Sequence, residues 1–189
     1  MTIDNMKERL REILKERSYK KGDILLASGK RSDFYIDCRE TSLNPEGAYL
    51  LGKVLFQTLI SLNKDIEAVA GPTMGADPLV TAVTVISFQE KSPMPALIVR
   101  KEPKSHGMSL WIEGRGSLRD GARVALLEDV VTTGGSVLKA IKWVEEEGFK
   151  VVHVIAVLDR GDGGGERIQK EGYDFNALFT LKDVADKQK

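Results

Sequence analysis

The sequence is poor in the residue types that form covalent cross-links and transition-metal sites. Its 189 residues include a single cysteine, Cys38, so an internal disulfide is impossible and a reducing, cytoplasmic location is expected. No nucleophile motif surrounds Cys38, and we expect it to be a small thiol in the core. Two histidines and one cysteine are too few for a transition-metal site of the usual kind without several carboxylates.

Net charge and long apolar runs are also missing. Lysine plus arginine number 28, as do aspartate plus glutamate, so nothing in the charge balance favours a general nucleic-acid-binding protein. No apolar run is long enough to cross a bilayer, and the charged residues 1–10 lack the apolar core of a signal peptide. We therefore expect no nucleic-acid or membrane partner. The length of 189 residues suits a single domain, which we expect over residues 1–189.

Segments typical of strands alternate with segments of helical spacing. The expected strands cover residues 68–71, 96–100, 124–127 and 151–158, and the expected helices begin at Pro45, Asp77 and Ser136 and after residue 165. This alternation predicts an α/β fold with a mostly parallel central sheet flanked by helices. In such sheets ligands bind beyond the carboxyl ends of the strands.

The first 40 or so residues do not follow this alternation. An amphipathic helix is expected between Ile3 and Leu14, and two short strands around a glycine-containing turn between Leu25 and Asp37. Since neither element belongs to the parallel sheet, we expect this region to form a small N-terminal cap.

The most informative segment runs from Val124 to Ser136, with the sequence VALLEDVVTTGGS. An apolar strand is followed by two acids and then by a loop of small residues that begins a helix. Unpaired N–H groups and the helix dipole make such a loop a ready anion site. The segment lacks the Gly-Lys-Ser/Thr ending of a P-loop and the G-x-G-x-x-G of a dinucleotide fold. The simpler alternative is an ordinary strand-to-helix turn.

The acids Glu128 and Asp129 restrict which anionic ligand this segment can bind. A carboxylate repels phosphate, but it accepts hydrogen bonds from sugar hydroxyls and stabilises nearby positive charge. A phosphate site with two acids at its edge therefore suits a ribose phosphate. Magnesium, held largely by substrate phosphates, is the metal that this chemistry favours.

Three further segments follow expected strands. Residues 100–108 carry four potential cations between breakers, typical of a loop that closes over departing phosphates, or of a solvated charge run. The loop 71–77 has small residues that can present N–H groups to a second phosphate. The alternative that it is a plain turn without a binding role is equally open. Arg160 can pair with a carboxylate or paired carbonyls, or lie on the surface. We expect His153 to be a strand residue and not a ligand.

Together these segments resemble the type I phosphoribosyltransferases, and among them most closely those that use orotate. The resemblance is carried by the run 124–136, by LASGKRSDFY at 26–35, by RKEPKSHG at 100–107 and by Asp159-Arg160-Gly161, and it extends from about residue 23 to 165. Two departures are clear: relatives often carry lysine where this chain has Ala27, and an aromatic residue and lysine where it has Met74-Gly75.

The resemblance implies transfer of a phosphoribosyl group from phosphoribosyl pyrophosphate to orotate, with Mg²⁺, in a homodimer whose subunits share active sites. It implies that the activated sugar is bound by Arg100, Lys101, Lys104, His106, Glu128, Asp129, Val130, Val131, Thr132, Thr133, Gly134, Gly135 and Ser136. It implies catalytic roles for Lys101, Glu128 and Asp129. The implied orotate contacts are Thr132, Arg160, Tyr35 and Ile36. Two alternatives stay open: a purine phosphoribosyltransferase, and a regulator that senses the activated sugar and binds nucleic acid.

Overall fold

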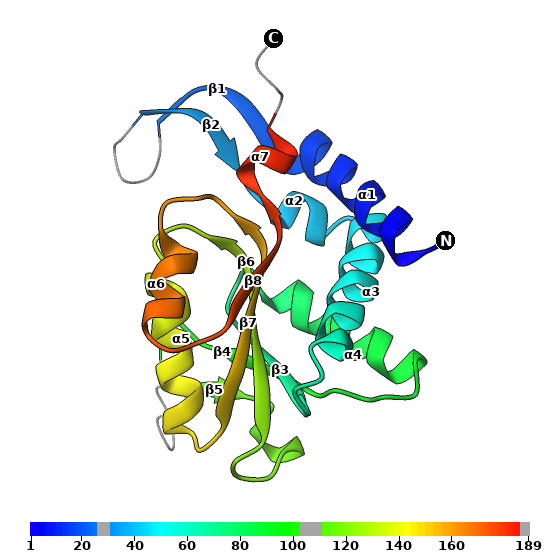
Figure 1. The fold of residues 1–189 in the computed structure, drawn as a ribbon, viewed down its shortest axis with the longest axis vertical. Helices are drawn as coiled ribbons and strands as arrows, with labels where there is room; N and C mark the ends of the chain where they lie inside the picture. The colour runs from blue at the N-terminus through cyan, green and yellow to red at the C-terminus, as the bar shows by residue number, and fades with distance from the viewer. Residues whose placement is uncertain (26–30, 103–110, 186–189) are drawn as a thin grey trace.

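The computed structural model describes residues 1–25, 31–102 and 111–185 and forms a central sheet with helices on both faces (Figure 1). The sheet has six strands in the order β5-β4-β3-β6-β7-β8. All neighbouring strands are parallel except β5, which is antiparallel to β4. Their bounds are β3 Ala68–Pro72, β4 Ala96–Val99, β5 Ile112–Glu113, β6 Arg123–Val131, β7 Lys150–Asp159 and β8 Phe175–Thr180. The predicted α/β class with a mostly parallel sheet is confirmed.

The main helices lie on opposite sides of this sheet (Figure 1). On one side are α1, α3 and α4, and on the other are α5 and α6. Their bounds are α1 Ile3–Ile13, α3 Pro45–Ser61, α4 Asp77–Gln89, α5 Gly135–Glu146 and α6 Gly164–Lys170. The start of α3 follows from its sequence, because the Asn44 side chain accepts hydrogen bonds from the N–H groups of Glu46 and Gly47 and Pro45 occupies the first turn.

The expected N-terminal cap consists of a hairpin and a short helix. A π-helical turn, Leu14–Ser18, links α1 to the strand β1, Tyr19–Leu25, which pairs antiparallel with β2, Arg31–Ile36. The short helix α2, Arg39–Ser42, follows. The hairpin was predicted, but its first strand begins well before Leu25. Lys20, Lys21 and Asp23 interrupt any apolar pattern in β1, so the sequence did not reveal this start.

Other predicted bounds change in the sheet itself. The strand β6 was expected to end at Leu127, but it continues through both acids to Val131, because Val130 and Val131 pair with the next strand, β7. The strand β8 and the short helix α7, Leu181–Val184, were not predicted. At the sheet edge β8 pairs with β7 alone and mixes polar with apolar residues, so no continuous apolar run marks it.

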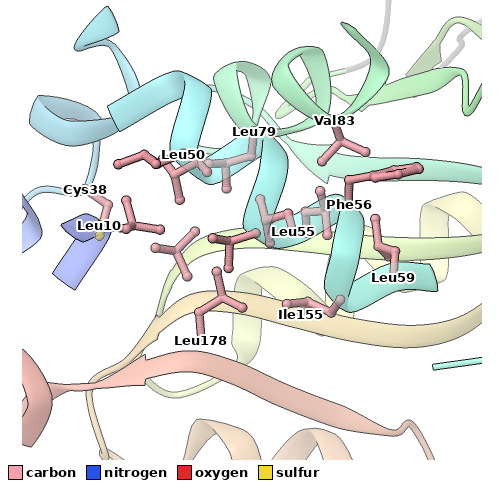
Figure 2. Close-up of a cluster of buried hydrophobic side chains, with 14 of the residues drawn as sticks. Leu10, Cys38, Leu50, Leu55, Phe56, Leu59, Leu79, Val83, Ile155 and Leu178 are labelled. Carbon is pink, nitrogen blue, oxygen red and sulfur yellow. The ribbon is translucent and has the colours of Figure 1, made fainter. Parts of the chain in front are cut away.

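Two hydrophobic clusters lie on the two faces of the sheet. Along β6, the side chains of Ala125 and Leu127 join the cluster under α3 and α4, while those of Val124 and Leu126 join the cluster under α5. Figure 2 shows the first cluster, in which Cys38 lies 1% exposed, confirming its expected place in the core. Within the described parts of the chain, no helix is long and apolar enough to span a bilayer.

Candidate active site

A cavity of about 680 Å³ lies where the carboxyl ends of the central strands meet the N-terminal cap. Its lining comes from β2 and the residues after it, from the β3–α4 loop, from the end of β4, from the β6–α5 segment and from Arg160 after β7. The lining residues are Phe34, Tyr35, Ile36, Asp37, Arg39, Pro72, Thr73, Met74, Gly75, Val99, Arg100, Lys101, Glu128, Asp129, Val130, Thr132, Ser136, Lys139, Trp143 and Arg160. The position agrees with the general rule for parallel sheets.

Glu128 is the deeper of the two acids. Its side chain is 5% exposed and accepts hydrogen bonds from the Asp129 N–H and the Ser136 hydroxyl, each at 3.2 Å. Burial, reinforced by the negative charge of Asp129, raises the pKa of Glu128 to about 8. The shift favours the protonated form of Glu128, and in that form the side chain can donate a hydrogen bond.

Asp129 is half-buried and lines the cavity. Its carboxylate accepts a hydrogen bond from the Val130 N–H at 2.8 Å. On another side the carboxylate lies against Gly75 of the β3–α4 loop, where a Cβ atom would be 2.5 Å from the Asp129 Cγ atom. The two strand-to-helix loops therefore meet at this carboxylate.

The loop between β6 and α5 leaves backbone N–H groups at the start of a helix. Gly134 has a φ of 74°, which favours glycine, and no side chain caps the N-terminus of α5. The start of α6 supports this loop: a Cβ atom on Gly164 would lie 2.4 Å from the Thr132 carbonyl oxygen, and Arg167 donates to the Thr133 carbonyl at 3.3 Å. The loop therefore has the uncapped N–H groups that the sequence predicted for an anion site, and the binding of an anion there stays a prediction.

The β3–α4 loop has hydrogen bonds that fix its shape. The Thr73 N–H donates to the Val99 carbonyl at 2.8 Å, and the Ala76 N–H donates to the Pro72 carbonyl at 3.2 Å. The Thr73 hydroxyl donates to the Asp77 carboxylate at 2.7 Å. The N–H groups of residues 74 and 75 have no partner in the described parts of the chain, so the expected presentation of amides to a phosphate stays a prediction.

Two of the four expected cations lie in the described structure. Arg100 and Lys101 both line the cavity, directly after β4. Arg100 donates to a Glu113 carboxylate oxygen at 3.0 Å and to the Glu102 carbonyl at 3.1 Å, while the Lys101 side chain is exposed. Lys104 and His106 lie outside the described residues, as do Ala27 and the neighbouring residues of the 26–30 turn.

The residues expected to contact the base come together. Tyr35 and Ile36 line the cavity from β2, and Thr132 and Arg160 line it from the sheet. The Arg160 N–H donates to the Val131 carbonyl at 3.0 Å, which fixes its backbone beside the end of β6. Its guanidinium pairs with Asp162, so the side chain is held close to the cavity.

Some residues of the motif do not face the cavity. Val131 is 1% exposed and packs in the core under α5, and residues 133–135 shape the loop behind Thr132. His153 lies in β7 and is 3% exposed, with its Nε2 atom 2.7 Å from the Asn176 Oδ1 atom. Its expected place in a strand is confirmed, although one ring nitrogen has no partner in the described part of the chain.

Four polar or aromatic lining residues were not predicted. Asp37 and Arg39 follow β2, where the Arg39 guanidinium donates two hydrogen bonds of 2.7 Å to the Asp37 carboxylate and lowers its pKa. Lys139 and Trp143 lie on α5, three and seven residues after Ser136. Helical spacing from Ser136 could have predicted that Lys139 and Trp143 line the cavity. No sequence pattern predicts that Asp37 and Arg39, which follow the hairpin, lie at the same cavity.

Comparisons with known proteins agree with this geometry. The model of the phosphoribosyl transferase domain family matches residues 44–178. An orotate phosphoribosyltransferase from Nostoc sp. is 45% identical over 182 residues, covering 96% of this chain and 86% of the relative. Another from Aquifex aeolicus is 45% identical over 181 residues, covering 94% of this chain and 97% of the relative.

Solved structures show the same likeness. Orotate phosphoribosyltransferase of Mycobacterium tuberculosis, in a complex with Fe(III) dicitrate, matches with a TM-score of 0.82 and 34% identity, over 96% of this chain and 99% of the other. A structure of that enzyme with 5-phospho-α-D-ribosyl 1-diphosphate matches with a TM-score of 0.77 and 32% identity, over 95% and 98%. The resemblance noted in the sequence is confirmed, and the chain belongs to the orotate phosphoribosyltransferase family.

Proposed function

We propose that this chain transfers the 5-phosphoribosyl group from phosphoribosyl pyrophosphate to orotate, giving orotidine 5-monophosphate and pyrophosphate for UMP synthesis. The single observation that supports this most is the meeting of two acids and an uncapped helix N-terminus in one cavity. The family adds support, since the Mycobacterium tuberculosis relative has been solved with the activated sugar. One folding unit over residues 1–189 is also proposed, because Leu10 of α1 packs in the same cluster as the sheet.

In this proposal the ribose 5-phosphate binds to the amides of residues 132–136, and the sugar hydroxyls face the acids. Asp129 accepts hydrogen bonds from a hydroxyl and stabilises the positive charge that develops on the ribose ring. Burial raises the pKa of Glu128 and favours its protonated form, and in this proposal that form donates to a hydroxyl oxygen. The two neighbouring acids therefore have different roles.

Orotate lies between the cap and the end of β7. Its carboxylate pairs with Arg160, whose planar guanidinium matches a planar carboxylate, and Thr132, Tyr35 and Ile36 complete its surroundings. Attack by the orotate N1 atom on the ribose C1 atom forms the new C–N bond while the C1–O bond to pyrophosphate breaks. Pyrophosphate leaves with the electron pair of that bond, and the N1 proton is released to water. No covalent intermediate with the protein is needed, so none of the proposed roles requires a nucleophilic side chain.

The departing pyrophosphate carries the developing negative charge. Arg100 and Lys101 lie at the cavity beside it, and Lys104 and His106 are proposed to act from the segment that follows. Mg²⁺ fits this site because the Asp129 carboxylate would offer it one hard oxygen ligand. Among the described residues no three His, Cys, Asp or Glu side chains form a metal site, so substrate phosphates would hold most of the ion. Bound there, it neutralises phosphate charge.

A homodimer with shared active sites is also proposed. A groove between α3 and α4 exposes apolar side chains, including Leu43 at 71%, Val85 at 52% and Tyr49 at 49% exposure. Leu43 also lines a hollow with Met74, Asp37 and Arg39, next to the active-site cavity. A second copy on this groove would therefore lie at the edge of the site. Co-expression of Asp129→Asn with Lys101→Ala should restore activity that neither homodimer has, and no restoration would contradict shared sites.

The proposed reaction is tested by pyrophosphate release from the activated sugar with one base at a time. Orotate is expected to support release, while hypoxanthine, adenine and xanthine are not. Release with a purine base instead would favour a purine phosphoribosyltransferase. A mobility-shift assay with RNA and DNA at physiological salt tests the regulator, and a specific complex without pyrophosphate release would favour it. A cytoplasmic location stays a prediction from the single cysteine.

A further inference from the structure

Gly75 leaves the space that the Asp129 carboxylate occupies. A Cβ atom built on Gly75 would lie 2.5 Å from both Cγ and Oδ2 of Asp129 and 2.6 Å from Oδ1. Real Cβ atoms do not approach other atoms so closely, so the whole carboxylate lies over the Gly75 Cα atom. The backbone itself does not require glycine here, because Gly75 is absent from the residues with positive φ.

The loop that carries Gly75 has little freedom to move away. Its conformation is fixed by the Thr73–Asp77 hydrogen bond of 2.7 Å and by the Thr73 N–H bond to the Val99 carbonyl. Gly71 packs as tightly, since a Cβ there would lie 2.4 Å from the Ala76 Cβ atom and 2.9 Å from the Leu127 carbonyl oxygen. A side chain at position 75 therefore has to displace Asp129 rather than the loop.

Asp129 has weaker restraints of its own. The Val130 N–H donates to one of its oxygens at 2.8 Å, and its other side faces the cavity. An ordinary van der Waals contact of Cβ begins near 3.4 Å. A methyl group at position 75 thus moves the carboxylate by about 1 Å, a displacement that can cost about 100-fold in rate at a catalytic centre.

We propose that Gly75 is a positioning residue for the reaction. Because it has no side chain, the Asp129 carboxylate can lie against its Cα atom, in the position from which it contacts the ribose hydroxyls. The proposal rests on the proposed function of the site. It also explains how the β3–α4 loop contributes without a charged side chain at residues 73–76.

The test is a double-mutant cycle between Gly75→Ala and Asp129→Ala. Calorimetry measures the affinity of each variant for phosphoribosyl pyrophosphate, and initial-rate kinetics measure kcat and KM of Gly75→Ala. In the otherwise unchanged protein, Gly75→Ala is expected to lower kcat/KM for the activated sugar by about 10- to 100-fold. In the Asp129→Ala background the same change should leave affinity unaltered, because no carboxylate remains to be displaced. Gly116→Ala is the matched control, since a Cβ there has no neighbour within 4 Å.

Two results would overturn the proposal: unchanged affinity and kcat/KM in Gly75→Ala, or an equal loss of affinity whether or not Asp129 is present. An equal loss would mean that the methyl group damages the loop and not the acid. Thermal unfolding of each variant separates this from general destabilisation. If the unmodified chain binds the activated sugar but transfers nothing to orotate, the proposed function fails while the binding cycle still decides the role of Gly75.

Discussion

The β6–α5 loop and the β3–α4 loop both follow a buried parallel strand and both line the cavity, yet they contribute in different ways. The first, together with the end of β6 before it and the start of α5 after it, brings the side chains of Asp129, Thr132 and Ser136 to the cavity, and the helix that follows has no side-chain cap. In the second, the polar side chains of Thr73 and Asp77 bond to each other. The same topology therefore yields one loop that, in the proposed function, acts through charge and amides, and another whose proposed contribution is its shape.

The largest effect is expected from removing the charge on the β6–α5 side. Asp129→Asn keeps the size of the side chain but takes away the negative charge that we propose to stabilise the ribose cation. We expect kcat/KM for the activated sugar to fall by about 100- to 1,000-fold, the usual cost of losing one preorganised electrostatic group. Initial-rate kinetics measure the loss. Glu146→Gln, an exposed acid on α5, is the control and should change little.

If Asp129→Asn kept the kcat/KM of the unmodified protein, the proposed contrast between the two loops would be contradicted, because the charge on the β6–α5 side would then have no role. The variant also has a second readout. The charge of Asp129 contributes to the raised pKa of Glu128, so the pKa of Glu128 should fall when that charge is removed.

The next effect concerns the support behind the phosphate loop. Gly164→Ala places a Cβ atom 2.4 Å from the Thr132 carbonyl oxygen and 2.6 Å from the Val131 Cγ1 atom. We expect the loop to shift and KM for the activated sugar to rise about tenfold, with a loss of roughly 1–3 kcal/mol in unfolding free energy from overpacking. Urea unfolding and initial rates measure both. An unchanged KM with reduced stability would show that the loop amides do not bind the phosphate.

These differences mark how far the sequence predicts this molecule. The order of the main strands and helices and the β6–α5 loop were predictable, because buried parallel strands are continuously apolar and the loop has its own local composition. The burial of Glu128 was not, since it depends on β7 continuing beside it and on Ser136 bonding to it. The contact between Gly75 and Asp129 joins residues 54 positions apart, beyond the reach of any local pattern.

A smaller, pH-dependent effect is expected at Glu128. Its pKa is about 8 in the folded protein against an ordinary value of 4.5. Between these values the unfolded chain loses the proton while the folded chain keeps it, so the unfolding free energy falls as the pH rises through this window. Glu128→Gln removes this dependence. Relative to the unmodified protein, the variant should gain on the order of a few kcal/mol between pH 5 and pH 7.5.

Urea unfolding at the two pH values checks the sign. A difference in unfolding free energy that stays constant with pH would contradict the burial of a protonated Glu128. The result also bears on the two neighbouring acids, since a neutral residue at position 128 and a charged one at position 129 is what the proposed mechanism requires.

The smallest effect is expected from the β3–α4 side. Thr73→Val preserves the shape of the side chain but removes the hydroxyl that donates to Asp77 at 2.7 Å. Asp77 then loses a partner in a half-buried position, at a cost of about 1–2 kcal/mol in unfolding free energy. Because this loop acts through its backbone shape, kcat/KM should stay within about threefold of the unmodified protein, while Thr73→Ser should match it in both measurements. A loss of more than tenfold in turnover without a loss of stability would show that the Thr73 hydroxyl takes part in the chemistry, and the contrast between the two loops would no longer hold.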